Sequence, residues 1–550
     1  MQYGAGRTYS DQALRSFCAR VAAAFFLFSA VLSAVPAQAQ SPLPTSDASL
    51  RDQNSSNAAM LKELEQMRAR IQELEAQLKA QSGGGANNGA GNTGSAGSEN
   101  FVAATQTLPQ GAAQQSARNK PEKPEPFSYA DWTWLTGNPR TKTLPFDSKF
   151  FTPEIRSDVS YIYDFANPID DTIGGSSEVF RSSEFQVTQL GVGGDFHFDN
   201  VHARVMTQLG MYSQTQPRND ASNARGQWLT LTPGIVDNGY RYISEAYGGY
   251  HINALNGINV DAGIFLSYIG LFSFYNFDNW AYQPSFVSSN TPWFFNGMRV
   301  QIFPNDKLKI EPWLINGWQS YGRFNHRPGV GGQILWRPRA WVSIVANQYA
   351  LGRDTLGVPN RSRFHTDDSI QIKYYENPDR FIDRAAFSLT IDAGCESGGG
   401  VNCFGNSATG VKQSFLGFMQ YNRFWLHKDL FGVTIGGGAI NNPGRYLVLL
   451  PPINGATAIT GTPYFTENPG DPFKGWDASL TFDYMPSQYI TFRWEYNHRA
   501  SNVPYYTGTG GITPNGGLGN SGPPGSLVPG FAPDLAKHEN RMNMAIMVKF

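Results

Sequence analysis

The sequence predicts an all-β protein, a transmembrane antiparallel up-and-down β-barrel of about 16 strands preceded by a short N-terminal coiled-coil helix. Three observations lead to this prediction. The chain begins with an export signal, apolar and polar residues alternate with a period of two along most of its length, and it ends on an alternating strand whose last residue, Phe550, is aromatic. Alternation with this period is typical of strands that have one apolar and one polar face.

The first residues have the order of charge and hydrophobicity that secretory signals need. Three arginines precede an apolar run over residues 21–35, and Ala-Gln-Ala follows at 37–39. We therefore expect residues 1–39 to be a signal peptide that is cleaved after export. The alternative, an N-terminal membrane anchor, is disfavoured because the run is shorter than the roughly 20 residues that span a bilayer.

The composition argues against a nucleic-acid partner and against catalysis. Without residues 1–39, 40 basic and 43 acidic residues remain, and nucleic-acid surfaces are strongly basic. The sequence contains no His-Glu-x-x-His, Cys-x-x-Cys or Gly-x-Ser-x-Gly motif and no Gly-Lys dipeptide of a phosphate loop. We expect no enzymatic activity, no cofactor and no metal.

The cysteines predict one disulfide. Of the three in the chain, Cys18 leaves with the signal peptide, so that Cys395 and Cys403 remain as a pair. Because an exported protein meets an oxidising compartment, we expect these two to be joined across a short loop.

Residues 40–81 are expected to contain a coiled-coil helix with its core at 57–80. Apolar residues recur there at alternating spacings of three and four, and charged residues fill most of the positions between them. Arg70, Ile71, Leu74 and Glu75 resemble the pattern of three-stranded coiled coils, which implies a homotrimer. The alternatives are a lone charged surface helix, which is marginal at this length, and a helix that contacts the cell wall.

Two linkers separate this helix from the rest of the chain. The stretch 82–126 is rich in Gly, Asn and Ser at first and in Pro at its end, so that a flexible part is followed by a stiff part. We assign everything after it, residues 127–550, to one β-barrel domain.

The clearest hairpin spans residues 190–211. Its apolar residues alternate with polar ones, and Asp199-Asn200 forms a two-residue turn. Counting back from this turn places His197 opposite His202 and Asp195 opposite Arg204, with opposite charges on the polar face. A metal held by the two histidines is a weaker reading than a polar pair, because no third ligand is evident.

The same alternation recurs at 258–266, 387–391, 476–484 and 492–496, with Trp and Tyr at the ends of the apolar faces. A soluble β-sandwich also alternates, but aromatic girdles at both ends of the apolar face are typical of outer-membrane barrels. Short connections alternate with long polar ones, such as 442–474 and 500–537, which is the asymmetry between periplasmic turns and external loops. The terminal Phe550 resembles the membrane-insertion signal of bacterial barrels.

Two segments resemble the OmpL-like β-barrel porin family. They are Phe-Ser-Tyr-Ala-Asp-Trp-Thr-Trp-Leu-Thr-Gly at 127–137, and Asp-Asn-Trp-Ala-Tyr-Gln-Pro-Ser-Phe at 278–286 followed by Thr-Pro-Trp-Phe-Phe-Asn-Gly at 291–297. The resemblance implies a pore in the Gram-negative outer membrane, surrounded by lipid and lipopolysaccharide, through which small hydrophilic solutes diffuse passively. The alternative is a tether or adhesin that the barrel only anchors.

The aromatic stretch 271–290 is expected to fold into the barrel and to narrow it. It is the third long external connection, and it is too apolar to stand in water. Its polar residues would line a wet constriction while its aromatic residues pack against the wall, so the candidate constriction residues are Asp278, Asn279, Trp280, Tyr282 and Gln283. Packing outside the barrel is the alternative. The inward charges are of both signs, so the sequence does not decide which ions the pore selects.

Overall fold

Sixteen strands close into one antiparallel ring within the part of the chain that the computed structural model describes. This part comprises residues 125–140, 143–144, 146–173, 179, 181–215, 240–289, 291–322, 328–350, 361–406, 408–443, 473–512 and 534–550. The last strand pairs with the first, from Lys549 opposite Arg156 to Arg541 opposite Asp164. Closure leaves no edge strand with unpaired backbone groups, which is the condition for crossing a membrane with strands.

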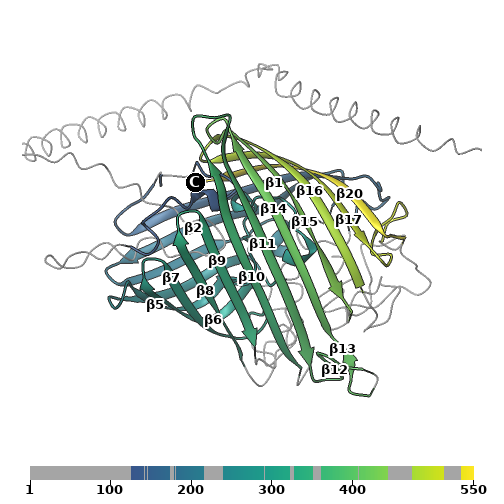
Figure 1. Cartoon of the computed structure of the whole chain (residues 1–550), viewed down its shortest axis with the longest axis horizontal. Coiled ribbons are helices and arrows are strands. Elements are labelled where there is room, and N and C mark those ends of the chain that lie inside the picture. Colours follow the sequence, from purple (N-terminus) through teal and green to yellow (C-terminus); the bar gives the residue numbers. More distant parts are fainter. Residues whose placement is uncertain are drawn as a thin grey trace, which may run out of the picture. The chain divides into compact units, whose positions relative to one another are not determined.

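The ring follows the order of the sequence, and each strand pairs with its neighbours in the chain. Its strands are β1 (Phe151–Asp164), β2 (Phe185–Phe198), β3 (Val201–Thr207), β4 (Ile243–Ile252), β5 (Ile258–Leu266), β6 (Phe294–Asn305), β7 (Leu308–Ile315), β8 (Gly329–Arg339), β9 (Val342–Ala350), β10 (Ser362–Glu376), β11 (Ile382–Ser397), β14 (Ser414–Leu426), β15 (Phe431–Asn442), β16 (Phe473–Ser487), β17 (Ile490–Ser501) and β20 (His538–Lys549). In Figure 1, β9, β10, β11 and β14 lie side by side along the near wall. The predicted barrel of about 16 strands is confirmed.

Short elements occupy the connections. They are η1 (Thr133–Leu135), α3 (Met211–Thr215), η5 (Asn276–Asp278), α5 (Phe286–Ser289), the pair β12 (Val401–Asn402) and β13 (Val411–Lys412), and the pair β18 (Tyr506–Thr507) and β19 (Leu535–Ala536). Among the described residues, no helix is long and apolar enough to cross a membrane. The predicted signal peptide, coiled coil and linker lie outside the described residues, apart from the last two positions of the linker.

Alternation separates a polar inner face from an apolar outer face. On β16, Trp476 and Leu480 are each 50% exposed on the outside, whereas Asp477 and Asp483 are buried on the inside. The β2–β3 hairpin has the register that the sequence predicts, with His197 opposite His202 across the Asp199-Asn200 turn. His202 does not turn toward His197, because its Nε2 lies 2.6 Å from the Asp261 carboxylate on β5.

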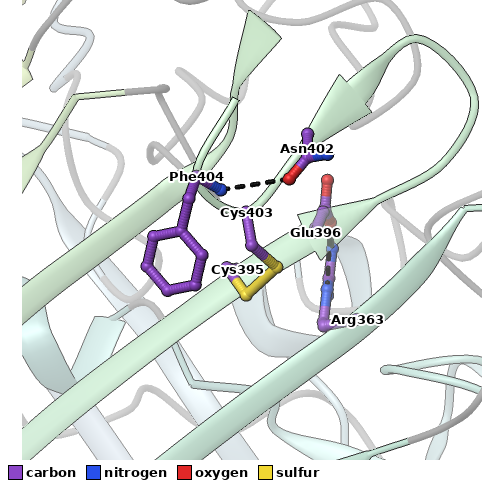
Figure 2. The surroundings of a disulfide bond; sticks show 6 residues. All are labelled: Arg363, Cys395, Glu396, Asn402, Cys403 and Phe404. Carbon is purple, nitrogen blue, oxygen red and sulfur yellow. Dashed lines mark hydrogen bonds and ion pairs between the residues drawn. A yellow bond between two sulfur atoms is a disulfide. The ribbon is translucent and has the colours of Figure 1, made fainter. Parts of the chain in front are cut away.

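The two rims of the barrel differ in the length of their connections. The short-turn rim carries tight turns, such as 199–200 and 306–307, and both the start of β1 and the end of β20. The long-loop rim carries the longer connections, among them the stretch between β11 and β14. In that stretch a disulfide joins Cys395, at the end of β11, to Cys403. Figure 2 shows it beside the ion pair of Arg363 and Glu396, whose charged atoms lie 2.6 Å apart.

We predict that the mature protein, unfolded in denaturant without reductant, contains no free thiol, and that reduction releases two. The bond closes a short loop. Cross-links of this kind stabilise folded proteins by roughly 2 to 4 kcal/mol, because they restrict the conformations of the unfolded chain. Thiol titration before and after reduction measures this. Free thiols in the unreduced sample would contradict the prediction.

Candidate pore constriction

Residues 267–289, here called the inner segment, leave the long-loop rim after β5 and are largely buried against the inner face of the barrel. Trp280, Tyr282 and Phe286 are each at most 2% exposed. Such a segment brings backbone N–H and C=O groups into a place where no strand pairs with them, and buried backbone groups need partners. The charged side chains of the wall supply these partners.

Strand β17 binds the backbone of the inner segment at several points. Glu495 accepts hydrogen bonds from the N–H groups of Tyr282 and Gln283, at 2.6 and 2.8 Å. Arg493 donates to the carbonyl oxygen of Asn279 at 2.7 Å, and Arg499 donates to that of Pro284 at 2.6 Å. Hydrogen bonds with one charged partner are about twice as strong as neutral ones. The segment is therefore fixed at several points along its length.

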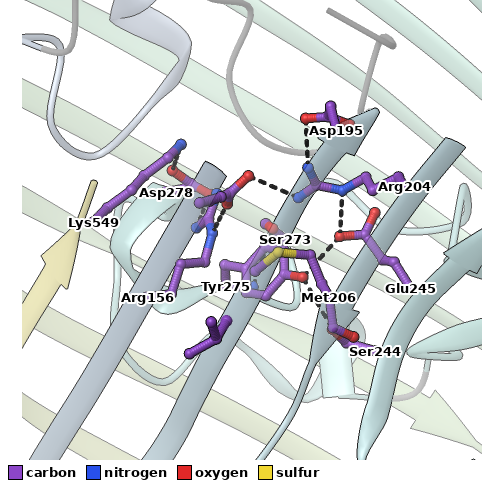
Figure 3. Close-up of polar contacts among 12 residues, drawn as sticks. Arg156, Asp195, Arg204, Met206, Ser244, Glu245, Ser273, Tyr275, Asp278 and Lys549 are labelled. Atoms are coloured by element: carbon purple, nitrogen blue, oxygen red, sulfur yellow. Dashed lines mark hydrogen bonds and ion pairs between the residues drawn. The ribbon is translucent and has the colours of Figure 1, made fainter. Parts of the chain in front are cut away.

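On the adjoining strands β20 and β1, the inner segment also meets a network of ion pairs, shown in Figure 3. Asp278 lies 2.7 Å from the guanidinium of Arg156 on β1 and 3.3 Å from the ammonium of Lys549 on β20. Burial acts to raise the pKa of Asp278, but these two cations hold it below its ordinary value. The Asp278 carboxylate therefore stays charged as it joins the segment to the wall.

The same network continues through Tyr275 and Arg204. The Tyr275 hydroxyl donates to Glu245 at 2.8 Å, and its ring lies 3.9 Å below the Arg156 guanidinium. Arg204 in turn pairs with Glu245 at 2.9 Å and with Asp195 at 2.8 Å. Positively and negatively charged groups alternate in this network, so neither sign of charge predominates in it.

A second segment, residues 125–140, crosses the interior near the short-turn rim, and we call it the strap. The Phe127 N–H donates to the carbonyl of Asp306 in the β6–β7 turn at 2.7 Å. At the other end, the Asn138 amide donates to the carbonyl of Ser487 at the end of β16, at 3.1 Å. Between these points, Trp132 and Trp134 are fully buried.

The strap and the inner segment share one apolar cluster with the wall. Trp132, Trp134 and Leu135 of the strap belong to it together with Leu271 and Trp280 of the inner segment. Wall residues complete the cluster, among them Trp425 on β14, whose ring centroid lies 5.7 Å from that of Trp280. Gly137 permits this approach, because a Cβ there would stand 2.3 Å from the carbonyl oxygen of Asn279.

Asp483 on β16 holds the strap, the inner segment and the wall together. Its carboxylate lies 2.7 Å from Arg423 and 2.6 Å from Arg493, and all three side chains are fully buried. Arg423 also donates to the carbonyl oxygen of Gly137 in the strap at 2.6 Å and to that of Trp280 at 3.2 Å. One carboxylate therefore orients two guanidinium groups that bind both segments.

A cavity of about 30 Å³ lies on the β6–β8 side of the inner segment, lined by Phe272, Arg299 and Trp313 among others. This volume holds about two or three water molecules.

All five residues that the sequence suggests for the constriction lie in the inner segment and are at most 5% exposed. Asp278, Asn279 and Gln283 were expected to face water, but in the structure they are as buried as the aromatic residues beside them. Sequence reasoning missed the strap and Arg423. The strap could have been found from its tryptophans, which lie between a Pro-rich linker and the first strand. Arg423 could not be assigned to the inner face from the sequence, because its strand has apolar residues on both faces.

The sequence profile of the family described as "Putative beta-barrel porin-2, OmpL-like" matches residues 157–520. The chain belongs to this family. It is an outer-membrane porin, and its family and fold are those of a channel rather than an enzyme. Among the described residues, no group of three or more His, Cys, Asp or Glu side chains is arranged to hold a metal ion.

Several solved outer-membrane proteins have similar structures. The outer membrane channel DcaP of Acinetobacter baumannii is 13% identical, with 74% of this chain and 100% of that chain covered and a TM-score of 0.41. An anion-selective porin from Comamonas acidovorans is 9% identical, with 73% and 99% covered and a TM-score of 0.41. OprB of Pseudomonas putida at high pH is 11% identical, with 73% and 94% covered and a TM-score of 0.39. No curated protein sequence matches the chain.

We predict that Asp483→Asn destabilises the folded barrel by about 3 to 5 kcal/mol, the usual cost of leaving a buried ionic partner uncompensated. Arg423 and Arg493 would lose their shared counter-charge. Urea unfolding in detergent, followed by tryptophan fluorescence, measures the effect. Asp199→Asn in an exposed turn is the matched control and should change nothing, and equal stability of the two variants would argue against the role of Asp483.

Proposed function

We propose that this porin passes small hydrophilic solutes by passive diffusion, and that the inner segment and the strap together bound its narrowest passage. The observation that carries the proposal is the binding of the inner segment's backbone by wall charges, above all by Glu495 and Arg493. A loop that only caps the outside of a barrel needs no such partners within the wall. Asp278, Asn279, Trp280, Tyr282 and Gln283 remain the proposed constriction residues.

The proposal includes an orientation and an assembly. The short-turn rim and the N-terminal segment face the periplasm, because short turns are periplasmic in outer-membrane barrels. The coiled-coil pattern around Arg70, Ile71, Leu74 and Glu75 supports a homotrimer, with contact to the cell wall as its other possible role. Outer-membrane lipid and lipopolysaccharide surround the barrel.

We propose no catalysis and no cofactor, since the charged groups that hold the inner segment are engaged in ion pairs and hydrogen bonds with the protein. The rival function is a tether or adhesin for which the barrel is only an anchor. Planar-bilayer recording of the purified protein separates the two. A porin gives reproducible current steps, and an anchor gives none.

Deleting residues 278–285 is expected to raise single-channel conductance and to widen the range of sugars admitted in liposome swelling. The deletion removes the part of the inner segment that Glu495, Arg493 and Arg499 bind. Deleting residues 514–521, an equal number in the long β18–β19 connection, is the control. Unchanged conductance in a folded 278–285 variant would place the constriction elsewhere.

Replacing both Trp132 and Trp134 with alanine is expected to increase the time that single channels spend open. The two rings fill the shared cluster of strap and inner segment, so that truncation loosens the strap. Trp476→Ala, on the outer face, removes a ring of the same size without touching the interior and serves as the control. Identical gating of the two variants would show that the strap does not obstruct the pore.

A further inference from the structure

Arg337 is a buried cation of the inner wall that no carboxylate of the described chain balances. Its side chain lies on β8 near the short-turn rim and is 3% exposed. Within the described residues, no acidic group forms an ion pair with it, and its Nη1 has no hydrogen-bond partner. Its Nε donates to the Ser343 hydroxyl on β9, at 3.4 Å. By contrast, Arg299 on β6 pairs with the Asp261 carboxylate at 2.8 Å.

The strap covers this guanidinium with two aromatic rings. The guanidinium carbon lies 5.0 Å from the ring centroid of Phe127 and 4.7 Å from that of Trp132. The Trp132 indole donates to the carbonyl oxygen of Phe127 at 2.9 Å, so the strap itself holds the two residues together. The Tyr129 hydroxyl donates to the backbone carbonyl of Arg337. The strap therefore contacts Arg337 through both its side chain and its backbone.

Aromatic rings do not neutralise a guanidinium. The face of a ring attracts a cation through its quadrupole, but it offsets only part of the cost of taking the charge out of water. The neighbouring strands add no free negative charge, because β9 carries no acidic residue and Glu311, the acidic residue of β7, is already paired with Lys309. Buried charges are normally paired, and a small anion can supply the missing counter-charge.

The chemistry of the guanidinium defines the ligand. Its N–H groups form a planar fork that binds the two oxygens of a carboxylate side by side. Phe127 and Trp132 belong to the strap and not to a barrel strand, so they can be displaced from Arg337 while the ring of strands stays closed. A carboxylate can therefore take the place of the rings beside this side chain.

We propose that Arg337 is a binding site for small anions beneath the strap, where a permeating solute places its carboxylate group. The site adds one uncompensated positive charge to an inner wall on which arginines such as Arg299 and Arg423 are paired with carboxylates. The pore therefore favours anionic solutes over cationic ones. The inference rests on the passive-diffusion porin proposed above and names a solute class for it.

Reversal potentials across a gradient of potassium acetate, recorded in planar bilayers with the full-length mature protein, test the charge. Arg337→Gln should lower the ratio of acetate to potassium permeability roughly threefold, the Coulomb factor for one unit charge about 6 Å from an ion in water. Arg337→Lys keeps the charge and should keep the ratio. Arg339→Gln removes an exposed charge from the end of the same strand and is the matched control. An unchanged ratio in Arg337→Gln would overturn the proposal, whatever happens to total conductance.

Quenching of tryptophan fluorescence by iodide tests the site without an open channel. Iodide bound at Arg337 lies beside the Trp132 ring, so the protein in detergent should show a saturable component of quenching when sodium iodide replaces sodium chloride. Sodium acetate should compete with it, and Arg337→Gln and Trp132→Phe should each remove it.

The two measurements separate the site from the porin. Saturable quenching that persists in Arg337→Gln would refute the anion site. If the wild-type protein shows the saturable component but gives no current steps, the site is supported and the porin proposal fails. Current steps without a saturable component refute the site alone.

Discussion

The shared carboxylate of Asp483 is the contact on which the interior depends. A barrel wall can satisfy its own backbone by closing on itself, but a chain segment laid across the interior cannot, because no neighbouring strand is there to pair with it. Asp483 holds Arg423 and Arg493 in place. These two arginines donate hydrogen bonds to carbonyl oxygens of the strap and the inner segment that no strand pairs with. Removing water from three charges is costly, and only their mutual pairing offsets that cost.

This constraint explains the mixture of charges on the inner wall. Acidic groups are needed where the inner segment presents N–H groups, as at Glu495, and basic groups where it presents carbonyls, as at Arg493. Both signs are therefore required by the segment's own backbone, whatever solute the pore admits. A count of inward charges taken from the sequence consequently says little about ion selectivity, since most of those charges are engaged with protein.

The sequence predicts what depends on local periodicity and misses what depends on distant contacts. The β2–β3 register follows from a two-residue turn and alternation, and the inner segment could be identified because its aromatic residues exceed what a loop in water can expose. The burial of Asp278 could not be inferred, because its partners Arg156 and Lys549 lie at opposite ends of the barrel domain in sequence and meet only when the ring closes. The strap was missed for a similar reason, since its two anchors lie on turns far apart in the chain.

The same reasoning applied to the outer wall gives a different result for the same side-chain type. Inside the barrel, Asp278 is charged, buried and paired with two cations. Outside, Asp368 has only neutral donors and faces a solvent that cannot stabilise a carboxylate. Whether a carboxylate lies on the inner or the outer face of a strand therefore decides whether cations of the protein or only neutral donors surround it.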